Sequence, residues 1–177
     1  MNLQKYFWNN NQNSYLLSNQ QEIFDKLKDF KLIGPIHIGG EEGNGKTFLA
    51  RRLLDKDSIY LPIHYNFDKV LLKNYSLIVV DNINNFHAKI LSKLKRCIQN
   101  CKLLIIISEN YSNSLDNDIN TIVRRNMDLI PPDIEELNNL ANYFFEFFKI
   151  SIQTLPKNVN NFQKLIDFFN QINLKKE

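Results

Sequence analysis

Eight residues decide the fold of this chain: Gly40-Glu41-Glu42-Gly43-Asn44-Gly45-Lys46-Thr47. They match the pattern G-x-x-x-x-G-K-[ST] at every fixed position, and this pattern binds phosphate where it joins a strand to a helix. We expect a strand just before it, over 32–38, and a helix over 46–54. The alternative is a turn without a ligand, but such a turn does not require both the lysine and the threonine. The residues expected to bind nucleotide are Gly40, Gly43, Asn44, Gly45, Lys46 and Thr47.

Each part of this loop has a physical role. The glycines let successive backbone N–H groups curl around a phosphate, and the helix N-terminus adds a partial positive charge. Lys46 is expected to reach the β- and γ-phosphates, and the Thr47 hydroxyl to ligate Mg²⁺. Glu41 and Glu42 oppose a polyanion unless their side chains point to solvent. We therefore expect a modest nucleotide affinity.

A second motif ends at Asp81, where the apolar run Leu77–Val80 predicts a buried strand that finishes in an acid. Such an acid lies opposite Thr47 across the metal, so Thr47 and Asp81 are the candidate Mg²⁺ ligands. Asn82 follows, at a position where hydrolytic proteins with such a phosphate loop often carry a carboxylate. An amide can hold a water but cannot accept its proton. Asp81 and Asn82 are the candidate catalytic pair, and we expect at most a weak ATPase.

Short apolar strands alternate with helices around these motifs. Strands are expected over 32–38, 59–61, 77–80, 103–107 and 127–130, and helices over 20–30, 46–54 and 87–100. This alternation predicts a parallel α/β sheet with helices on both faces. Beyond Pro131-Pro132 only helices are expected, over 133–148 and 161–173. We therefore divide the chain into an N-terminal segment (1–20), a phosphate-binding α/β core (21–131) and a small helical lid (132–177).

Composition excludes several classes. The chain has 177 residues with 5 Gly, 5 Pro and 2 Cys, which argues against collagen-like and disulfide-rich proteins. No apolar run approaches the roughly 20 residues that a membrane span needs, and the start does not resemble a signal peptide. We expect a cytoplasmic protein that does not associate with membranes. The net charge of +3 is too small to indicate nucleic-acid binding, and no sequence-specific DNA binding is expected.

Two more polar residues are candidate sensors of the γ-phosphate. The strand over 103–107 ends in Ser108-Glu109-Asn110, beside the expected Asp81 strand. Ser108 and Asn110 would then face the phosphate from the strand tip. Polar residues close most strands, however, so an ordinary strand end explains them equally well.

Four stretches together resemble the AAA+ family of the bacterial replication initiator DnaA and its small paralogue Hda. They are residues 40–49 (GEEGNGKTFL), 79–83 (VVDNI), the strand ending at Ser108, and 129–133 (LIPPD). The likeness to Hda-type chains is closer, because these have a similar Asp-Asn pair and a segment similar to residues 15–19 (YLLSN), which lies near the adenine. The resemblance implies an AAA+ three-layer core with about five parallel strands and a truncated helical lid. It also implies an ATP- or ADP- and Mg²⁺-binding regulator of chromosomal DNA replication initiation that acts on DnaA.

The chain departs from this family at its arginines. The family's arginine finger would fall at Ile122, while Arg124 and Arg125 lie two and three residues later. Either arginine could serve with a shifted register, or both could be ordinary surface residues. The sensor arginine of the lid has no clear counterpart, although Lys157 and Asn160 lie nearby. Losing such arginines costs orders of magnitude in rate, so we expect a binder rather than an efficient enzyme.

Partner surfaces are expected at both ends. The family's peptide for the sliding clamp would correspond to Gln4–Trp8 (QKYFW), which has the right place but matches poorly. An aromatic cluster covering the chain's own sheet is the alternative. The lid has more phenylalanines than two helices can bury, so we expect some to face a partner or a second copy in a homodimer.

Two other function classes stay open. A small P-loop ATPase or nucleotide kinase would need a catalytic carboxylate that Asn82 does not supply. An interaction module that has lost nucleotide is favoured by the missing sensor arginine and by Glu41 and Glu42. Cys97 and Cys101, which we place on one helical stripe, are expected to be buried apolar residues rather than metal ligands.

Overall fold

The computed structural model describes residues 16–28, 34–62, 73–83, 88–114, 117–151 and 154–174. The predicted alternation of strands and helices is confirmed there. The elements are α2 (Ser18–Lys28), β1 (Gly34–Gly39), α3 (Lys46–Arg52), β2 (Ser58–Pro62), β3 (Tyr75–Asp81), α4 (Ala88–Gln99), β4 (Cys101–Ile107), the 3-10 turn η2 (Ser112–Ser114), α5 (Asn117–Asn120), β5 (Arg125–Asp128), α6 (Ile134–Phe147) and α7 (Phe162–Leu174).

The five strands form one parallel sheet in the order β2-β3-β4-β1-β5. Strand β1 lies between β4 and β5, with Ile36 opposite Ile105 on one side and Arg125 on the other. Strand β3 lies on the far side of β4. Because parallel strands end at the same edge, this order places the ends of β1, β4 and β3 next to one another. These ends carry the phosphate loop, Ser108 and Asp81.

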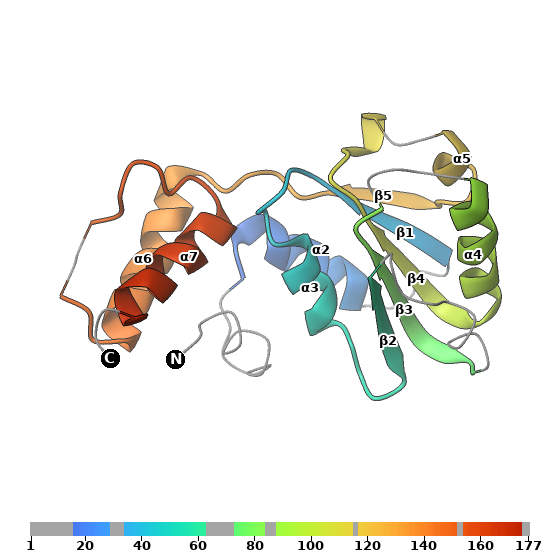
Figure 1. Ribbon diagram of the computed structural model, residues 1–177, viewed down its shortest axis with the longest axis horizontal. Coiled ribbons are helices and arrows are strands. Elements are labelled where there is room, and N and C mark those ends of the chain that lie inside the picture. Colours follow the sequence, from blue (N-terminus) through green and yellow to red (C-terminus); the bar gives the residue numbers. More distant parts are fainter. Residues whose placement is uncertain are drawn as a thin grey trace.

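Helices cover both faces of the sheet, as the buried apolar strands require. Along β3, Leu77 and Val79 pack toward α2 and α3 in one apolar cluster. Ile78 and Val80 point the other way and share a second cluster with residues of α4 and α5. Figure 1 shows the resulting layers, with α2 and α3 on one side of the sheet and α4 on the other. The predicted three-layer α/β core is therefore confirmed.

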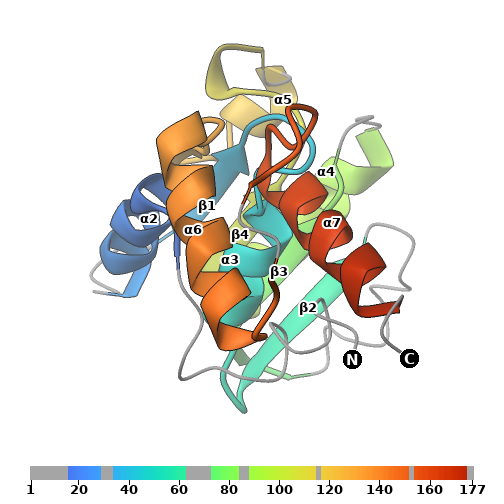
Figure 2. The ribbon, with the colours of Figure 1, turned by 90° about the vertical axis from the view of Figure 1, so that its left-hand side faces the viewer.

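Helices α6 and α7 pack side by side beyond α2 and α3 (Figures 1 and 2). Asp133 caps α6, because its Oδ1 accepts a 2.8 Å hydrogen bond from the Glu136 backbone N–H. Phe144 and Phe169 are fully buried between the two helices, with their ring centroids 5.2 Å apart. Phe147 lies on the outer face of α6 and is 47% exposed. The division of the chain into core and lid stays a prediction.

Two details of the sequence analysis need correction. Helix α4 ends at Gln99, so Cys101 is the first residue of β4 and does not continue the helical stripe of Cys97. Asn100 ends the helix, since its backbone N–H donates to Cys97 O and its side chain to Arg96 O. The short elements η2 and α5 were not predicted. Across the described ranges, no helix combines the length and the apolar character that crossing a membrane requires.

Candidate functional site

A cavity of about 470 Å³ opens where the ends of β2, β3 and β4 meet the phosphate loop and the start of α7. Among its described lining residues, Lys46 is the single cation, while Glu42, Asp81 and Glu109 are acids. The acids therefore outnumber the cations. The lining consists of Glu42, Gly43, Gly45, Lys46, Thr47, Phe48, Tyr60, Pro62, Asp81, Asn82, Ile107, Ser108, Glu109, Phe162, Gln163 and Ile166.

The phosphate loop is shaped by glycines that no other residue replaces easily. Gly45 is the N-cap of α3 and has a φ of 87°, in the left-handed region. A Cβ there would also meet Gln20 Nε2 at 2.5 Å. Gly40 has a φ of 129°, and the Leu129 carbonyl at the end of β5 takes the place that a Cβ would need. The neighbouring elements therefore hold the loop closely from outside the cavity.

The Asn44 side chain belongs to this outer support. Its Nδ2 donates a 3.2 Å hydrogen bond to Leu129 O, while the backbone carbonyl of Asn44 accepts a 2.9 Å hydrogen bond from Gln20 Nε2. Both Asn44 and Gln20 are buried. The Asn44 side chain thus ties the loop to β5, and the Gln20 side chain ties it to α2, rather than facing the cavity.

Lys46 lies along the inside of the loop. Its Nζ donates to the carbonyls of Gly40 at 2.6 Å and Glu41 at 2.7 Å. Burial lowers the pKa of Lys46, and the nearby carboxylates, Glu109 first among them, partly oppose that shift. The ammonium group has three protons, so two are accounted for by the loop and one can point into the cavity.

Thr47 and Asp81 meet across the cavity floor. Thr47 Oγ1 donates a 2.7 Å hydrogen bond to Asp81 Oδ2, and Asp81 is only 7% exposed. A hydroxyl and one carboxylate are a suitable donor set for Mg²⁺, which prefers oxygen ligands and is usually held by one or two carboxylates together with substrate phosphates. Across the described part of the chain, no group of three or more His, Cys, Asp or Glu side chains is arranged to bind a metal by itself.

Tyr60, which the sequence analysis missed, is the third member of this group. Its hydroxyl donates to the same Asp81 Oδ2, from the neighbouring strand β2. Burial, together with Asp81, raises the pKa of Tyr60 to about 12, so the phenol stays protonated. The signal was available, since a tyrosine in a predicted strand beside the Asp81 strand reaches the same edge of a parallel sheet.

Asn82 lines the cavity and is exposed. Its φ is 65°, a left-handed conformation that asparagine tolerates better than most residues. In this conformation its backbone N–H donates a 2.7 Å hydrogen bond to Asp81 Oδ1. Asn82 therefore helps to orient the carboxylate through its backbone.

Ser108 lines the cavity and Asn110 does not. Ser108 is 1% exposed, and its Oγ lies 2.8 Å from Nε2 of the buried His37 on β1. His37 Nδ1 in turn lies 3.2 Å from Asn126 Oδ1 on β5, and burial lowers the pKa of His37. Glu109, rather than Asn110, is the second cavity residue of this segment. Neither the place of Glu109 in the cavity nor the contact of His37 with Ser108 was predicted from the sequence.

Arg124 and Arg125 lie at the opposite edge of the sheet. Arg124 donates its backbone N–H to Pro35 O, and its side chain packs against Gly34 at the start of β1. Arg125 pairs with Ile36. The phosphate loop follows the other end of β1, so the structure does not bring these two arginines to the cavity of their own chain.

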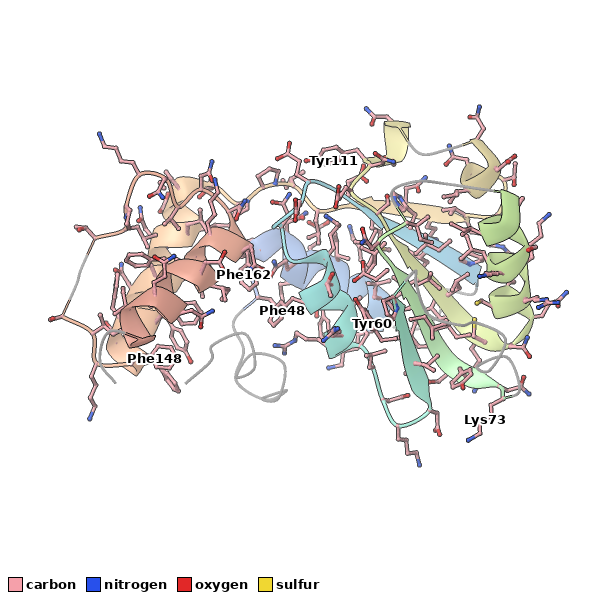
Figure 3. The ribbon with its side chains drawn as sticks, viewed as in Figure 1. Phe48, Tyr60, Lys73, Tyr111, Phe148 and Phe162 are labelled. Carbon is pink, nitrogen blue, oxygen red and sulfur yellow. The ribbon has the colours of Figure 1, made fainter. Side chains whose placement is uncertain are left out.

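Helix α7, which belongs to the predicted lid, contributes residues to the cavity. The Gln163 backbone N–H donates a 3.0 Å hydrogen bond to Gly43 O, and Phe162 packs on Phe48 of α3 with ring centroids 5.2 Å apart (Figure 3). Lys157 and Asn160 are exposed and do not line the cavity. Gln4–Trp8, the candidate clamp peptide, lies outside the described residues.

No protein-family model matches this sequence, and no curated protein matches it either. Solved structures do match. The crystal structure of a DNA replication initiation factor has a TM-score of 0.69 and 15% identity, over 92% of this chain and 63% of that chain. Domain III of DnaA from Thermotoga maritima has a TM-score of 0.67 and 16% identity, over 91% and 85%. The RuvB Holliday junction branch migration motor from the same organism has a TM-score of 0.66 and 12% identity, over 88% and 61%.

These neighbours are AAA+ proteins, and the chain has the AAA+ fold. It spans less than two thirds of the length of the replication initiation factor and of RuvB. A fold that is shared by an initiator domain and a branch migration motor does not by itself determine a role.

Proposed function

We propose that this protein binds ATP or ADP with Mg²⁺ in the cavity and acts as a DnaA/Hda-like regulator of DNA replication initiation. The main observation that supports a nucleotide site is the contact between Thr47 and Asp81 at the end of the phosphate loop, beside the Lys46 ammonium group. The resemblance in sequence and the likeness in fold to DnaA domain III support the regulatory role. We place the α/β core at 21–131 and the helical lid at 132–177, in the cytoplasm.

Different residues of the chain are proposed to bind the phosphate, to balance its charge and to hold the metal. The backbone of Gly43–Gly45 is proposed to cradle a phosphate at the start of α3, and the Asn44 N–H, which donates to Glu41 O at 3.4 Å in this structure, would have to turn toward it. Lys46 supplies the compensating positive charge, and Thr47 and Asp81 hold Mg²⁺. The bound metal would neutralise phosphate charge, which matters here because the acids of the cavity outnumber its cations.

Hydrolysis is expected to be slow. A general base must accept a proton from water, and the Asn82 amide cannot do so. Neither Arg124 nor Arg125 lies at the cavity of its own chain, and the polar residue of the predicted lid that does is Gln163. An arginine that stabilises phosphoryl transfer is worth roughly 10³–10⁵ in rate. We therefore propose a nucleotide-dependent binder rather than an efficient ATPase.

A thermal-shift and turnover experiment tests the nucleotide part. Ligand at about 100 times its Kd stabilises a protein by about 2.7 kcal/mol, which for a chain of this size raises the Tm by roughly 5–10 °C. We expect such a shift with ADP or ATP in the presence of Mg²⁺, together with little or no phosphate release. Rapid release would favour a P-loop ATPase or kinase instead. The absence of any shift would favour an interaction module, a reading that the acidic cavity also supports.

The partner is tested separately, by co-purification with the replication initiator DnaA and with the sliding clamp. We expect nucleotide-dependent capture of the initiator. Deletion of residues 1–15 should remove capture of the clamp but leave capture of the initiator intact, because Gln4–Trp8 lies in that segment. Failure to capture the initiator under any nucleotide condition would contradict the regulatory role while leaving the nucleotide site intact.

A further inference from the structure

Asp81 Oδ2, the carboxylate oxygen that faces Thr47, has a second donor. Thr47 Oγ1 donates to it at 2.7 Å, and the Tyr60 hydroxyl donates to it as well. All three residues line the cavity. The Tyr60 hydroxyl is therefore hydrogen-bonded to Asp81, one of the two residues that we propose as Mg²⁺ ligands.

The fold holds Tyr60 in this position from two sides. Strands β2 and β3 run parallel, with Tyr60 opposite Val79 and Pro62 opposite Asp81. On its other side the ring is covered by the Arg51 guanidinium of α3, 4.3 Å from the ring centroid. A cation over the ring face stabilises this placement. The Tyr60 hydroxyl is thus aimed at Asp81 by the sheet and by α3 together.

The number of donors that the Asp81 carboxylate can accept determines how the Tyr60 hydrogen bond affects metal binding. An ionised carboxylate accepts at about four lone-pair sites. Thr47 and Tyr60 use two of them on Oδ2, and the Asn82 backbone N–H uses one on Oδ1. Mg²⁺ usually keeps several of its waters, and each of these needs an acceptor. One site is left on Oδ1, but a metal held by both Thr47 and Asp81 would approach Oδ2, the oxygen that faces Thr47, and would there compete with the Tyr60 hydroxyl.

We propose that Tyr60 is a positioning residue that holds the Asp81 carboxylate while no metal is bound and releases it when Mg²⁺ enters. The inference rests on the proposed nucleotide function. Without the metal, the phenol stabilises a carboxylate that is only 7% exposed. When the metal binds, this hydrogen bond must break, and the free energy of breaking it lowers the affinity for Mg²⁺. Tyr60 thus makes nucleotide binding depend on a high concentration of Mg²⁺.

The test is Tyr60→Phe, which removes the hydroxyl and keeps the ring under Arg51. The matched control is Tyr75→Phe, at the other end of the neighbouring strand β3 and outside the cavity. Calorimetry measures ADP affinity with and without Mg²⁺, and electron paramagnetic resonance measures Mn²⁺ binding with ADP present. We expect Tyr60→Phe to bind the metal about tenfold more tightly, since one hydrogen bond to a charged group is removed from the competition.

Two further readouts, the melting temperature and the tyrosine ultraviolet spectrum, help to separate the possible outcomes. In chelator, Tyr60→Phe should melt at a lower temperature than both the wild type and Tyr75→Phe, because Asp81 loses a donor. Unchanged or weaker metal binding by Tyr60→Phe would overturn the proposal. If the variant does not fold, the wild type still reports: adding metal must change its tyrosine ultraviolet difference spectrum, and a flat spectrum at saturating metal would overturn the proposal. No heat with ADP in the wild type would instead show that the nucleotide function itself is wrong.

Discussion

Thr47 Oγ1 and Asp81 Oδ2 lie 2.7 Å apart, which joins the first turn of α3 to the end of β3. The two residues come from the two motifs that the sequence predicts to share a metal. The parallel sheet brings both of these ends to one edge. This contact is the geometric basis of the Mg²⁺ site that we propose.

Removing this hydrogen bond should destabilise the protein. Thr47→Val keeps the shape of the side chain but leaves the buried Asp81 with one donor fewer, so we expect a loss of about 2 kcal/mol in the free energy of unfolding, measured in urea. Thr47→Ser retains the hydroxyl and should stay close to the wild type. A Thr47→Val variant as stable as the wild type would show that the hydrogen bond to Asp81 does not contribute to stability.

We expect the buried His37 to make the free energy of unfolding depend on pH. Burial lowers its pKa below the ordinary value of 6.5, so the unfolded chain takes up the proton before the folded protein does. The free energy of unfolding should therefore fall as the pH drops from about 7.5 to 5.5, by at most about 1.4 kcal/mol per pH unit from this group. His37→Gln should show a shallower slope in urea unfolding across that range. Equal slopes would mean that His37 does not cause the dependence.

The left-handed backbone conformation of Lys149 makes this residue a site for a stabilising substitution. It follows α6 with a φ of 51°, while its backbone N–H donates to Glu146 O and that of Ile150 donates to Phe145 O. This is the helix ending in which glycine is preferred, because a Cβ is disfavoured at a left-handed residue. Lys149→Gly should raise the free energy of unfolding by about 1 kcal/mol, or the Tm by roughly 2–4 °C. Lys149→Ala, which keeps the Cβ, should give no such gain.

Much of this fold was predictable, for a definite reason. The phosphate loop has a fixed spacing, and Leu77–Val80 and Leu103–Ile107 are apolar runs that only a doubly covered sheet can bury. The short helix α5 was missed because four residues carry no usable periodicity. Cys101 was wrongly assigned to the helical stripe of Cys97 because it continues an apolar spacing past the turn at Asn100.

The site was predicted less completely, because part of it depends on contacts between distant segments. Lys46, Thr47 and Asp81 belong to motifs and were found from them. Tyr60 and Gln163 reach the cavity only through the pairing of β2 with β3 and the packing of α7 on the loop. His37 likewise lies hydrogen-bonded to Ser108, a candidate sensor of the γ-phosphate, although 71 positions separate the two residues in the sequence.

The most direct test of the central claim is a calorimetric titration of ADP with Mg²⁺ into the wild type, Lys46→Ala and Lys56→Ala. Lys46 lines the cavity, whereas Lys56 is an exposed lysine between α3 and β2 that serves as the matched control. We predict saturable binding at one site per chain in the wild type and in Lys56→Ala, and at least a tenfold loss of affinity in Lys46→Ala. No binding by the wild type, or equal affinity in all three proteins, would contradict a nucleotide site in this cavity.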